Sequence, residues 1–434
     1  MSRKMKDSGV EWIGEIPEAW EVTKVKNAIT SLLSGSTPDS NNEDYYCDYA
    51  TGIPWITISD MSNMDYISHT KKTITMEAFE SNNLSLLPIG TLIYSIYASL
   101  GNVSELSIDA TTNQAILGMI IDEKKIYKKY LKFWLKSTQA NISYYMNSNT
   151  QNNLNANIVK NLPLVFPCID IQQKIATYLD QKVAEIDNII SKTQASIEEY
   201  KRYKQSIITE AVTKGLDPNV PMKDSGIEWI GEIPEHWEVK RVKHSTSVIG
   251  SGTTPESGNT DFYDGDIPWI QSGDLYGRDV IIETEKNITP LAVKSYSALR
   301  FYKNDFVIVA MYGASVGNVA ISKISGYVNQ ACCVLLPNES NDVRYLYYWL
   351  ATCKDDLVRQ SFGGGQPNIS QQKIKNEPYL QAPLLEQQRI ADYLDDKCSK
   401  IDHIISKKEQ LINNLESYKK SLIYEVVTGK KEVM

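Results

Sequence analysis

The chain has 434 residues, of which 42% are hydrophobic and 23% are charged, and its formal net charge is −8. This composition is typical of a folded globular protein and excludes the disordered and collagen-like classes, and the length suffices for two or three domains. No apolar run approaches the roughly 18 residues of a membrane span, and the first residues lack the apolar core of a signal peptide. We therefore expect a cytoplasmic protein.

The six cysteines and four histidines are scattered along the chain. The cysteines show neither the spacing of a disulfide framework nor a CxxC pair, as expected for a reducing compartment. With so few histidines, and none of them grouped, a structural zinc site is not expected. We assign no metal ligands and no catalytic residues.

A long internal repeat sets the expected architecture. Residues 5–22 read MKDSGVEWIGEIPEAWEV and residues 222–239 read MKDSGIEWIGEIPEHWEV, with 16 of 18 positions identical. Matching blocks follow in the same order as far as QQKIATYLDQKVAEIDNIIS at 172–191 and QQRIADYLDDKCSKIDHIIS at 387–406. A repeat over the whole length predicts two copies of one structural module. We expect the opening motif to mark the junction between a long helix and a globular domain.

Each copy begins with a strand-rich region. Residues 20–120 alternate short β-branched and aromatic runs with Gly, Ser, Asn and Pro clusters, which predicts a compact domain with long loops. Residues 126–147 then have a helical pattern. The two copies differ most at 62–90 and 276–304. Such divergence on a shared scaffold indicates two modules that are attached alike but recognise different targets.

A heptad pattern follows each strand-rich region. From 170 to 214, and again from 390 to 426, apolar side chains recur at alternating steps of four and three, which predicts helices of roughly 45 residues, or about 65 Å. Because one such helix is not stable alone, the two are expected to pair. The expected fold is α+β, with two strand-rich globular domains joined by two long antiparallel helices in a coiled coil and related by a pseudo-twofold axis. The seam positions to which we assign partner binding are Leu179, Ile186, Ile190, Ile197, Leu394, Ile401, Ile405 and Leu415.

Several motifs occur in this order in both copies. They are SGxEWIGEIPExWEV, the SGSTP and SGTTP segments at 34–38 and 251–255, IPWI, NQA, and the QQKIATYLDQKVAEIDNII opening of the long helix. Together they resemble the specificity subunit of Type I restriction-modification systems. The resemblance covers the entire chain.

The resemblance implies a role in prokaryotic phage defence. Each globular domain would be a target recognition domain that reads one half of a bipartite, asymmetric site in double-stranded DNA, and the subunit would direct both methylation and restriction. The helices would set the gap between the half-sites and dock two methyltransferase (modification) subunits, through which restriction and translocase subunits join. S-adenosylmethionine, ATP and Mg are expected in the partner subunits and no cofactor on this chain. The expected divisions are target recognition domain 1 at 1–165, spacer helix 1 at 168–215, target recognition domain 2 at 216–380, and spacer helix 2 at 384–430.

The acidic net charge does not by itself suit a DNA-binding protein, since phosphate contact favours a basic surface. Local basic patches at 124–132, 69–73 and 238–244 offer phosphate contacts, and partner subunits could supply the rest. The alternative for 124–132 is a solvated helix face.

Base edges are read by polar and basic side chains, so the candidate DNA-binding residues come from loops that carry them. In the first copy these are Ser36, Thr37, Thr57, Ser59, Lys71, Lys72, Tyr97, Ser99, Gln151 and Asn153. In the second copy they are Thr253, Thr254, Gln271, Ser272, Arg278, Tyr312, Ser315, Gln366 and Asn368.

Some of these candidates have a purely structural alternative. The SGSTP segment can be a turn, and the Asn-Gln pair at 113–114, repeated at 329–330, can bond its own backbone. Motifs common to both copies are better suited to hold the fold or touch phosphate. Base discrimination is expected where the copies differ, including 61–83 and 276–300.

Two other classes of function are alternatives. A self-sufficient amino-methyltransferase should carry an Asn/Asp-Pro-Pro-Tyr/Phe motif, and the nearest match is NEPY at 376–379. No GxxxxGK[ST] phosphate loop is present, because GGGQPN lacks its Lys and Ser/Thr. Catalysis is therefore expected in partner proteins. The other alternative is a coiled-coil adaptor whose globular domains bind protein.

Overall fold

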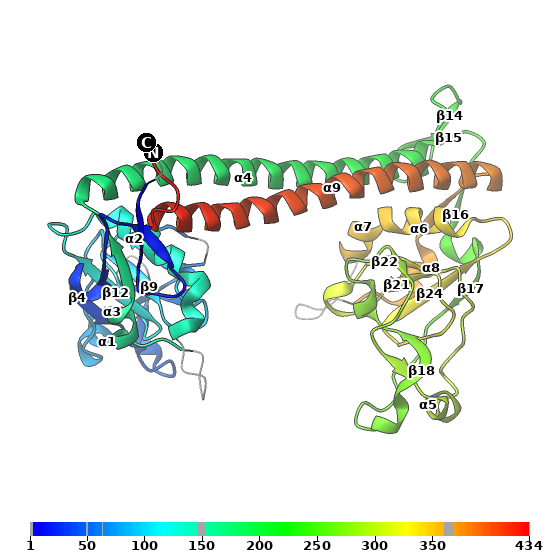
Figure 1. Cartoon of the computed structure of the whole chain (residues 1–434). Coiled ribbons are helices and arrows are strands. Elements are labelled where there is room, and N and C mark those ends of the chain that lie inside the picture. Colours follow the sequence, from blue (N-terminus) through cyan, green and yellow to red (C-terminus); the bar gives the residue numbers. More distant parts are fainter. Residues whose placement is uncertain (1–2, 49–50, 63, 146–152, 360–367, 434) are drawn as a thin grey trace. The chain divides into compact units, whose positions relative to one another are not determined.

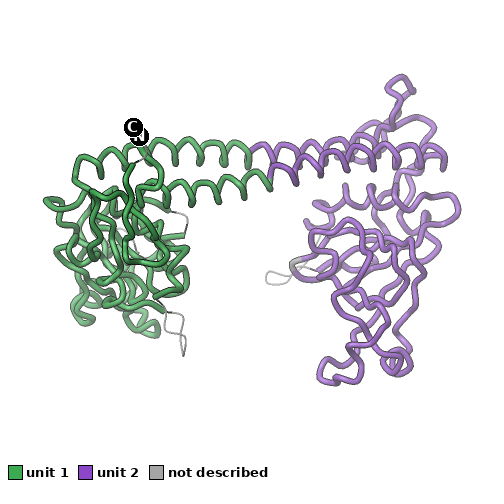
Figure 2. Tube along the Cα trace, in the orientation of Figure 1, with its two compact units in different colours: residues 1–194, 409–434 green, residues 195–408 purple. Residues whose placement is uncertain are grey.

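The structure is a computed structural model that describes residues 3–433 except 49–50, 63, 146–152 and 360–367. The chain divides into two compact units, one comprising residues 1–194 and 409–434 and the other residues 195–408 (Figure 2). Each unit therefore contains a strand-rich part together with a stretch of each long helix.

Unit 1 contains the elements of the first sequence copy (Figure 1). Its strands are β1 (Met5–Asp7), β2 (Glu15–Pro17), β3 (Glu21–Lys24), β4 (Ile29–Ser34), β5 (Tyr46–Cys47), β6 (Ile53–Ile56), β7 (Tyr66–Ile67), β8 (Lys72–Ile74), β9 (Leu92–Ser95), β10 (Val103–Leu106), β11 (Thr111–Thr112), β12 (Ile116–Ile121) and β13 (Pro163–Phe166). Its helices are α1 (Met76–Ser81), α2 (Lys128–Thr138), α3 (Ala156–Asn161), the first part of α4 (Ile169–Lys214) and the last part of α9 (Leu384–Val427).

Unit 2 contains the second copy and the remaining parts of α4 and α9. Its strands are β14 (Met222–Asp224), β15 (Glu232–Pro234), β16 (Glu238–Arg241), β17 (Thr246–Gly250), β18 (Tyr263–Ile270), β19 (Val280–Ile281), β20 (Asn287–Ile288), β21 (Phe306–Ala310), β22 (Val319–Ser322), β23 (Tyr327–Val328), β24 (Cys332–Pro337) and β25 (Pro378–Gln381). Its other helices are α5 (Pro290–Ser295), α6 (Val343–Thr352), α7 (Lys354–Arg359) and α8 (Gln371–Asn376).

The two units repeat one sheet topology. The strand order β4-β12-β9-β10-β7 in unit 1 corresponds to β17-β24-β21-β22-β19 in unit 2. In both sheets the last strand pairs parallel with its neighbour and the other pairs are antiparallel. The second sheet is β11-β6-β8-β5 in unit 1 and β20-β18-β23 in unit 2, and it too contains one parallel pair. The prediction of an α+β fold with an internal repeat is confirmed.

Both faces of the central strand of each large sheet are buried. In β21 (Phe306–Ala310), Val307 and Val309 belong to the core formed with α6 and the long helices, whereas Ile308 and Ala310 belong to a core with β18 and β23. Strand β9 divides its side chains in the same way between two cores of unit 1. This alternation follows from the two-residue period of a strand and explains the nearly continuous apolar runs in the sequence.

Within each unit the two long helices pack against each other. In unit 1, Ile186 of α4 and Leu422 of α9 share one core, and Asp187 Oδ1 lies 2.6 Å from Lys419 Nζ. In unit 2, Lys204 Nζ of α4 lies 2.8 Å from Asp402 Oδ2 of α9. The two ion pairs occupy equivalent positions of the repeat, since Asp402 and Lys419 are the second-copy counterparts of Asp187 and Lys204.

The opening motif packs against the end of a long helix in each unit. In unit 1, the Tyr424 hydroxyl of α9 donates to the Trp12 carbonyl at 2.7 Å. In unit 2, a Cβ added at Gly215, the residue after α4, would lie 3.4 Å from the Trp237 ring. The expectation that this motif marks the junction between helix and globular domain is confirmed.

Replacing Gly429 with alanine is expected to destabilise unit 1. Gly429 has a φ of +75°, a left-handed conformation that costs other residues roughly 1–2 kcal/mol. A Cβ there would also lie 2.6 Å from Pro17 Cδ. We expect Gly429→Ala to lower the free energy of unfolding by about 2–4 kcal/mol in a denaturant titration. Gly9→Ala is the control, because Gly9 has a φ of +73° but nothing within 4 Å of its Cβ position. Equal losses in the two variants would contradict a packing role for Gly429.

Candidate nucleic-acid interface

The SGSTP segment of unit 1 and the SGTTP segment of unit 2 are held by hydrogen bonds to other residues of their units. Trp55 Nε1 donates to the Ser36 carbonyl at 3.1 Å, and the Thr37 hydroxyl donates to Gln114 Oε1. In unit 2, Trp269 Nε1 donates to the Thr253 carbonyl at 3.3 Å, and the Thr254 hydroxyl donates to Gln330 Oε1. Because the same bonds occur in both units, these shared loops act as scaffold. Base contact by Ser36, Thr37, Thr253 and Thr254 stays a prediction.

The Asn of the repeated Asn-Gln pair also bonds locally. Asn113 Oδ1 accepts from the Ala115 backbone N at 3.1 Å, and Asn329 Oδ1 accepts from the Ala331 backbone N at 3.1 Å. The structural alternative considered for this pair therefore applies to its asparagine.

A buried aspartate closes a loop in unit 1. Asp60 Oδ2 accepts hydrogen bonds from the Thr57 backbone N at 2.8 Å and the Thr57 hydroxyl at 2.7 Å. Its Oδ1 accepts from the Lys71 backbone N at 3.0 Å. The carboxylate thus joins the two ends of segment 61–70, which we call clamped loop 1. Ser59 is exposed, with its hydroxyl 2.9 Å from that of Thr57.

Unit 2 has the same clamp. Asp274, which is 2% exposed, accepts from the Gln271 backbone N at 2.7 Å and from the Glu285 backbone N at 3.0 Å. The segment that it closes, 275–284, is called clamped loop 2. Ser272, half-buried, begins the turn that leads to Asp274. Asp60 and Asp274 were not among the residues predicted from the sequence, although both copies carry an aspartate there.

The two clamped loops differ in sequence except at positions with a structural role. Aligned residue by residue, MSNMDYISHT and LYGRDVIIET share an aspartate, an isoleucine and a threonine. The isoleucines, Ile67 and Ile281, are 1% and 0% exposed. The threonine hydroxyls bond to residues just after the loops: Thr70 donates to the Lys72 carbonyl and Thr284 donates to Asn287 Oδ1. Each clamped loop therefore combines a few positions that are the same in both copies with variable positions between and before them.

Most of the variable positions that the structure describes in the clamped loops are exposed. Tyr66 and Val280, which are equivalent, are 47% and 44% exposed, and Tyr276 and Ile282 of clamped loop 2 are 74% and 69% exposed. Arg278 in the same loop is half-buried. An exposed variable segment on a fixed scaffold suits selective recognition.

Lys71 and Lys72 follow clamped loop 1 directly, and both are exposed. The Lys72 ammonium lies 5.7 Å from the centre of the Tyr46 ring, on strand β5. Their position fits the predicted phosphate or base contact, which no contact of the structure tests.

The structure brings two further groups of candidates together. In unit 1, the Leu154 backbone N donates to the Ile96 carbonyl at 3.1 Å, which places Asn153 beside Tyr97. In unit 2, Tyr312 and Asn368 form an isolated antiparallel bridge. Tyr97 and Tyr312 are 40% and 45% exposed, Ser99 is exposed and Ser315 half-buried. Gln151 and Gln366 lie outside the described residues.

The basic patch at 124–132 is engaged in ion pairs within unit 1. Lys128 Nζ lies 2.8 Å from Glu105 Oε1 and Lys129 Nζ lies 2.6 Å from Asp180 Oδ2. The hydrogen bond to Asp180 raises the pKa of Lys129, whereas burial lowers the pKa of Lys132. Lys128 and Lys129 therefore pair with carboxylates of β10 and α4, whereas Lys124 and Lys125 are exposed, and DNA contact by this patch stays a prediction.

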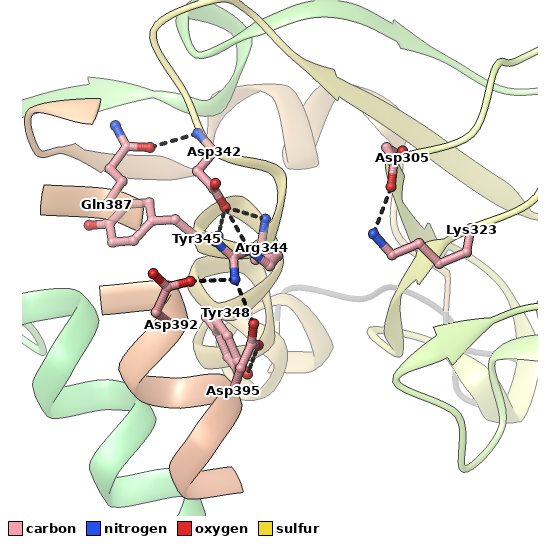
Figure 3. Close-up of polar contacts among 9 residues, drawn as sticks. All are labelled: Asp305, Lys323, Asp342, Arg344, Tyr345, Tyr348, Gln387, Asp392 and Asp395. Carbon is pink, nitrogen blue, oxygen red and sulfur yellow. Dashed lines mark hydrogen bonds and ion pairs between the residues drawn. The ribbon is translucent and has the colours of Figure 1, made fainter. Parts of the chain in front are cut away.

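In unit 2 an arginine makes the corresponding junction with the long helix (Figure 3). Arg344 Nη1 of α6 lies 2.7 Å from Asp392 Oδ1 and 2.8 Å from Asp395 Oδ2, both on α9. Partial burial lowers the pKa of Arg344, but the bonds to Asp392 and Asp395 outweigh it and the pKa lies above its ordinary value. Beside them, Gln387 Oε1 accepts from the Asp342 backbone N at 3.0 Å.

Unit 1 repeats this glutamine contact. Gln172 Oε1 accepts from the Tyr127 backbone N at 2.8 Å, and Gln172 is fully buried. Gln172 and Gln387 are the first glutamines of the QQKIA and QQRIA motifs, and this role was not predicted from the sequence. Its repetition at the start of both long helices was the available signal.

The seam positions assigned to partner binding lie inside the units. Six of them are buried and Ile405 and Leu415 pack against the cores as partly buried residues. The positions are Leu179, Ile186, Ile190, Ile197, Leu394, Ile401, Ile405 and Leu415. The assignment is corrected accordingly: their side chains face the chain's own interior, because an apolar seam is most stable when the matching helix covers it.

The NEPY segment does not form an open catalytic loop. Glu377 is 5% exposed and Tyr379 is fully buried, with its hydroxyl donating to Asn341 Oδ1 at 2.7 Å. Among the described residues there is no group of three or more His, Cys, Asp or Glu side chains suited to a metal ion. Of the helices in the described parts of the chain, none is long and apolar enough to span a membrane.

The family model for the Type I restriction modification DNA specificity domain matches the chain twice, at residues 17–199 and 234–416. The chain belongs to this specificity-domain family. Each match takes in one strand-rich part and the beginning of the following long helix.

Curated relatives of this specificity-domain protein agree with the assignment. The Type I restriction enzyme MjaIX specificity subunit of Methanocaldococcus jannaschii is 29% identical over 325 residues, covering 71% of this chain and 70% of the relative. The putative MjaX specificity subunit of the same organism is 26% identical and covers 97% and 96%. The EcoR124I/EcoR124II specificity subunit of Escherichia coli is 22% identical and covers 89% and 86%.

Solved structures share the fold of this specificity-domain protein. A chain from a study of complex assembly and conformational transition of the type I R-M system has a TM-score of 0.72 at 14% identity and covers 96% of this chain and 99% of its own. The HsdS subunit from Thermoanaerobacter tengcongensis has a TM-score of 0.51 at 14% identity and covers 96% and 98%. The resemblance found in the sequence motifs is confirmed.

Proposed function

We propose that the chain is the DNA specificity subunit of a Type I restriction-modification complex. Each strand-rich part, here 1–165 and 216–380, reads one half of a bipartite, asymmetric site in double-stranded DNA. The family membership and the names of the curated relatives support this role. By recognising this DNA site, the subunit directs both methylation and restriction.

The observation that carries the proposal is the pair of clamped loops. Asp60 and Asp274 accept the same two backbone hydrogen bonds in their units, while the segments that they close differ at most exposed positions. Two loops that are closed by matching backbone hydrogen bonds, but that expose different residues, suit the reading of two different half-sites. An adaptor that bound one partner protein at both ends would not need this difference.

The long helices are proposed to set the gap between the half-sites and to dock two modification subunits. Half-sites read from one side of a duplex lie about one helical turn, roughly 34 Å, apart, so a rigid spacer of fixed length suits the task. The divisions at 168–215 and 384–430 remain part of this proposal, beside the observed bounds Ile169–Lys214 and Leu384–Val427.

Catalysis is assigned to the partner subunits, including restriction subunits that join through the modification subunits. S-adenosylmethionine, ATP and Mg would bind there, and this chain would contribute recognition alone. With a net charge of −8, the chain also depends on its partners for much of the phosphate contact. The engagement of Lys128 and Lys129 in ion pairs within unit 1 strengthens this dependence.

Two measurements test the proposal. Sequencing of methylated bases in cells that express the chain with its modification subunits should give one motif of two half-sites separated by an unspecific gap. Gel-shift titrations should show specific binding to DNA with that motif over random DNA when the modification subunits are present. Absence of DNA binding with and without partners would refute the proposal in favour of the protein-binding adaptor.

A further inference from the structure

Clamped loop 2 is tied to the long helices of unit 2 by an ion-pair network. Lys204 Nζ of α4 lies 3.3 Å from Asp279 Oδ2 of the loop and 2.8 Å from Asp402 Oδ2 of α9. Burial lowers the pKa of Lys204, but the bond to Asp402 and the charges of Asp279 and Asp402 outweigh it, so its pKa lies above the ordinary value. The lysine is therefore charged at neutral pH and attracts both carboxylates.

In unit 1 the equivalent aspartate is held differently. Lys136 Nζ of α2 lies 2.5 Å from Asp65 Oδ1, and Lys132 Nζ donates to the Asp65 carbonyl at 2.8 Å. Burial raises the pKa of Asp65, but Lys136, with smaller contributions from the charges of Lys132 and Lys419, outweighs it and the pKa lies below its ordinary value. Lys419, the counterpart of Lys204, has its ion pair with Asp187 at 2.6 Å. Clamped loop 1 is thus held chiefly by its own domain.

The sequences of α2 and α6 explain this difference. At the positions of Lys132 and Lys136, helix α6 carries Tyr347 and Ala351. Neither can supply an ammonium group. Tyr347 is 9% exposed, and burial, followed by the charge of Asp279 and the hydrogen bond to it, holds the pKa of the Tyr347 hydroxyl well above the ordinary value, so this hydroxyl stays neutral and donates to Asp279. The nearest cation that the structure pairs with Asp279 is therefore on the long helix.

We propose that Lys204 is a positioning residue for base reading by unit 2, acting through Asp279 to hold clamped loop 2 against the helices. This inference rests on the proposed function, and it makes the two units unequal. Discrimination of the half-site read by unit 2 depends on Lys204 of the long helix α4, whereas discrimination of the half-site read by unit 1 depends on Lys136 of α2.

The test compares Lys204→Met with Lys419→Met in the full chain, assembled with its modification subunits. Each variant breaks one helix–helix ion pair, but only Lys204→Met also removes an ion pair to a clamped loop. The readout is the ratio of methylation rates on the complete site and on sites with one base pair changed in either half. Because partly exposed ion pairs are worth up to about 1 kcal/mol, we expect Lys204→Met to lower this ratio about threefold for the half-site read by unit 2 only. Lys419→Met should leave both ratios unchanged, and Lys204→Arg should restore the wild-type ratio.

Three results would overturn the inference. They are an unchanged ratio in Lys204→Met, an equal loss in Lys419→Met, and a failure of Lys204→Arg to restore discrimination. Asp279→Asn provides a second variant that leaves the pair of Lys204 with Asp402 intact, and it should reproduce the loss seen in Lys204→Met. If the wild-type complex showed no discrimination between sites, the proposed function itself would fail, which separates that failure from the failure of the positioning role.

Discussion

Exchanging the clamped loops is expected to transfer half-site preference. A chain that carries the 275–284 sequence at 61–70 should methylate its original site about tenfold to a hundredfold more slowly, since each lost base contact costs roughly 1–3 kcal/mol. It should instead methylate DNA whose first half-site is replaced by a copy of the second. The scaffold should tolerate the exchange because the shared aspartate, isoleucine and threonine are kept. Sequencing of methylated bases measures both effects.

The control exchanges the opening motifs in place of the loops. Their only differences are Val10 against Ile227 and Ala19 against His236, so Val10→Ile with Ala19→His completes the exchange in unit 1. We expect this chain to methylate the original site at the wild-type rate. If the loop exchange also left the site unchanged, base reading would have to be assigned outside the clamped loops.

Asp274→Ala is expected to impair reading by unit 2 without unfolding the chain. The change removes the acceptors of the Gln271 and Glu285 backbone N–H groups, and each buried donor left unpaired costs about 1–3 kcal/mol. Clamped loop 2 should then sample open conformations. We expect the affinity for DNA carrying the complete site to fall by at least about tenfold, and amide hydrogen exchange to accelerate within 271–285.

Two variants serve as controls for Asp274→Ala. Asp266 is exposed on strand β18, so Asp266→Ala removes the same charge from unit 2 and should leave affinity and exchange unchanged. Asp274→Asn keeps one acceptor oxygen and should have an intermediate effect. A wild-type affinity in Asp274→Ala would mean that the clamp does not position a base-reading segment.

The repeat and the periodic patterns predicted the larger features well. The heptad pattern predicted helices that the structure places at Ile169–Lys214 and Leu384–Val427, and the alternating apolar runs predicted the strand-rich parts. Both signals depend on local spacing of apolar side chains, which one sequence displays directly. The helix expected at 126–147 is the α-helix Lys128–Thr138 followed by a 3-10 helix at Gln139–Tyr145.

Interactions between distant residues were beyond such patterns. The lysines of 124–132 formed a basic patch in the sequence, yet Glu105 and Asp180, which neutralise Lys128 and Lys129, come from other elements. Likewise, the seam residues assigned to partner binding are buried or partly buried within the chain's own units. Which charges remain available for DNA depends on folding.

From the sequence alone, the chain was determined to contain two copies of one α+β module with long helices, equal in their scaffold and different at 62–90 and 276–304. Only the tertiary structure decided that Asp60 and Asp274 close the variable loops, and that Asp65 and Asp279 are held by lysines from different elements. The physical reason is that a hydrogen bond or ion pair requires two groups within a few ångströms. Apolar periodicity predicts elements, whereas that proximity arises only when the elements pack together.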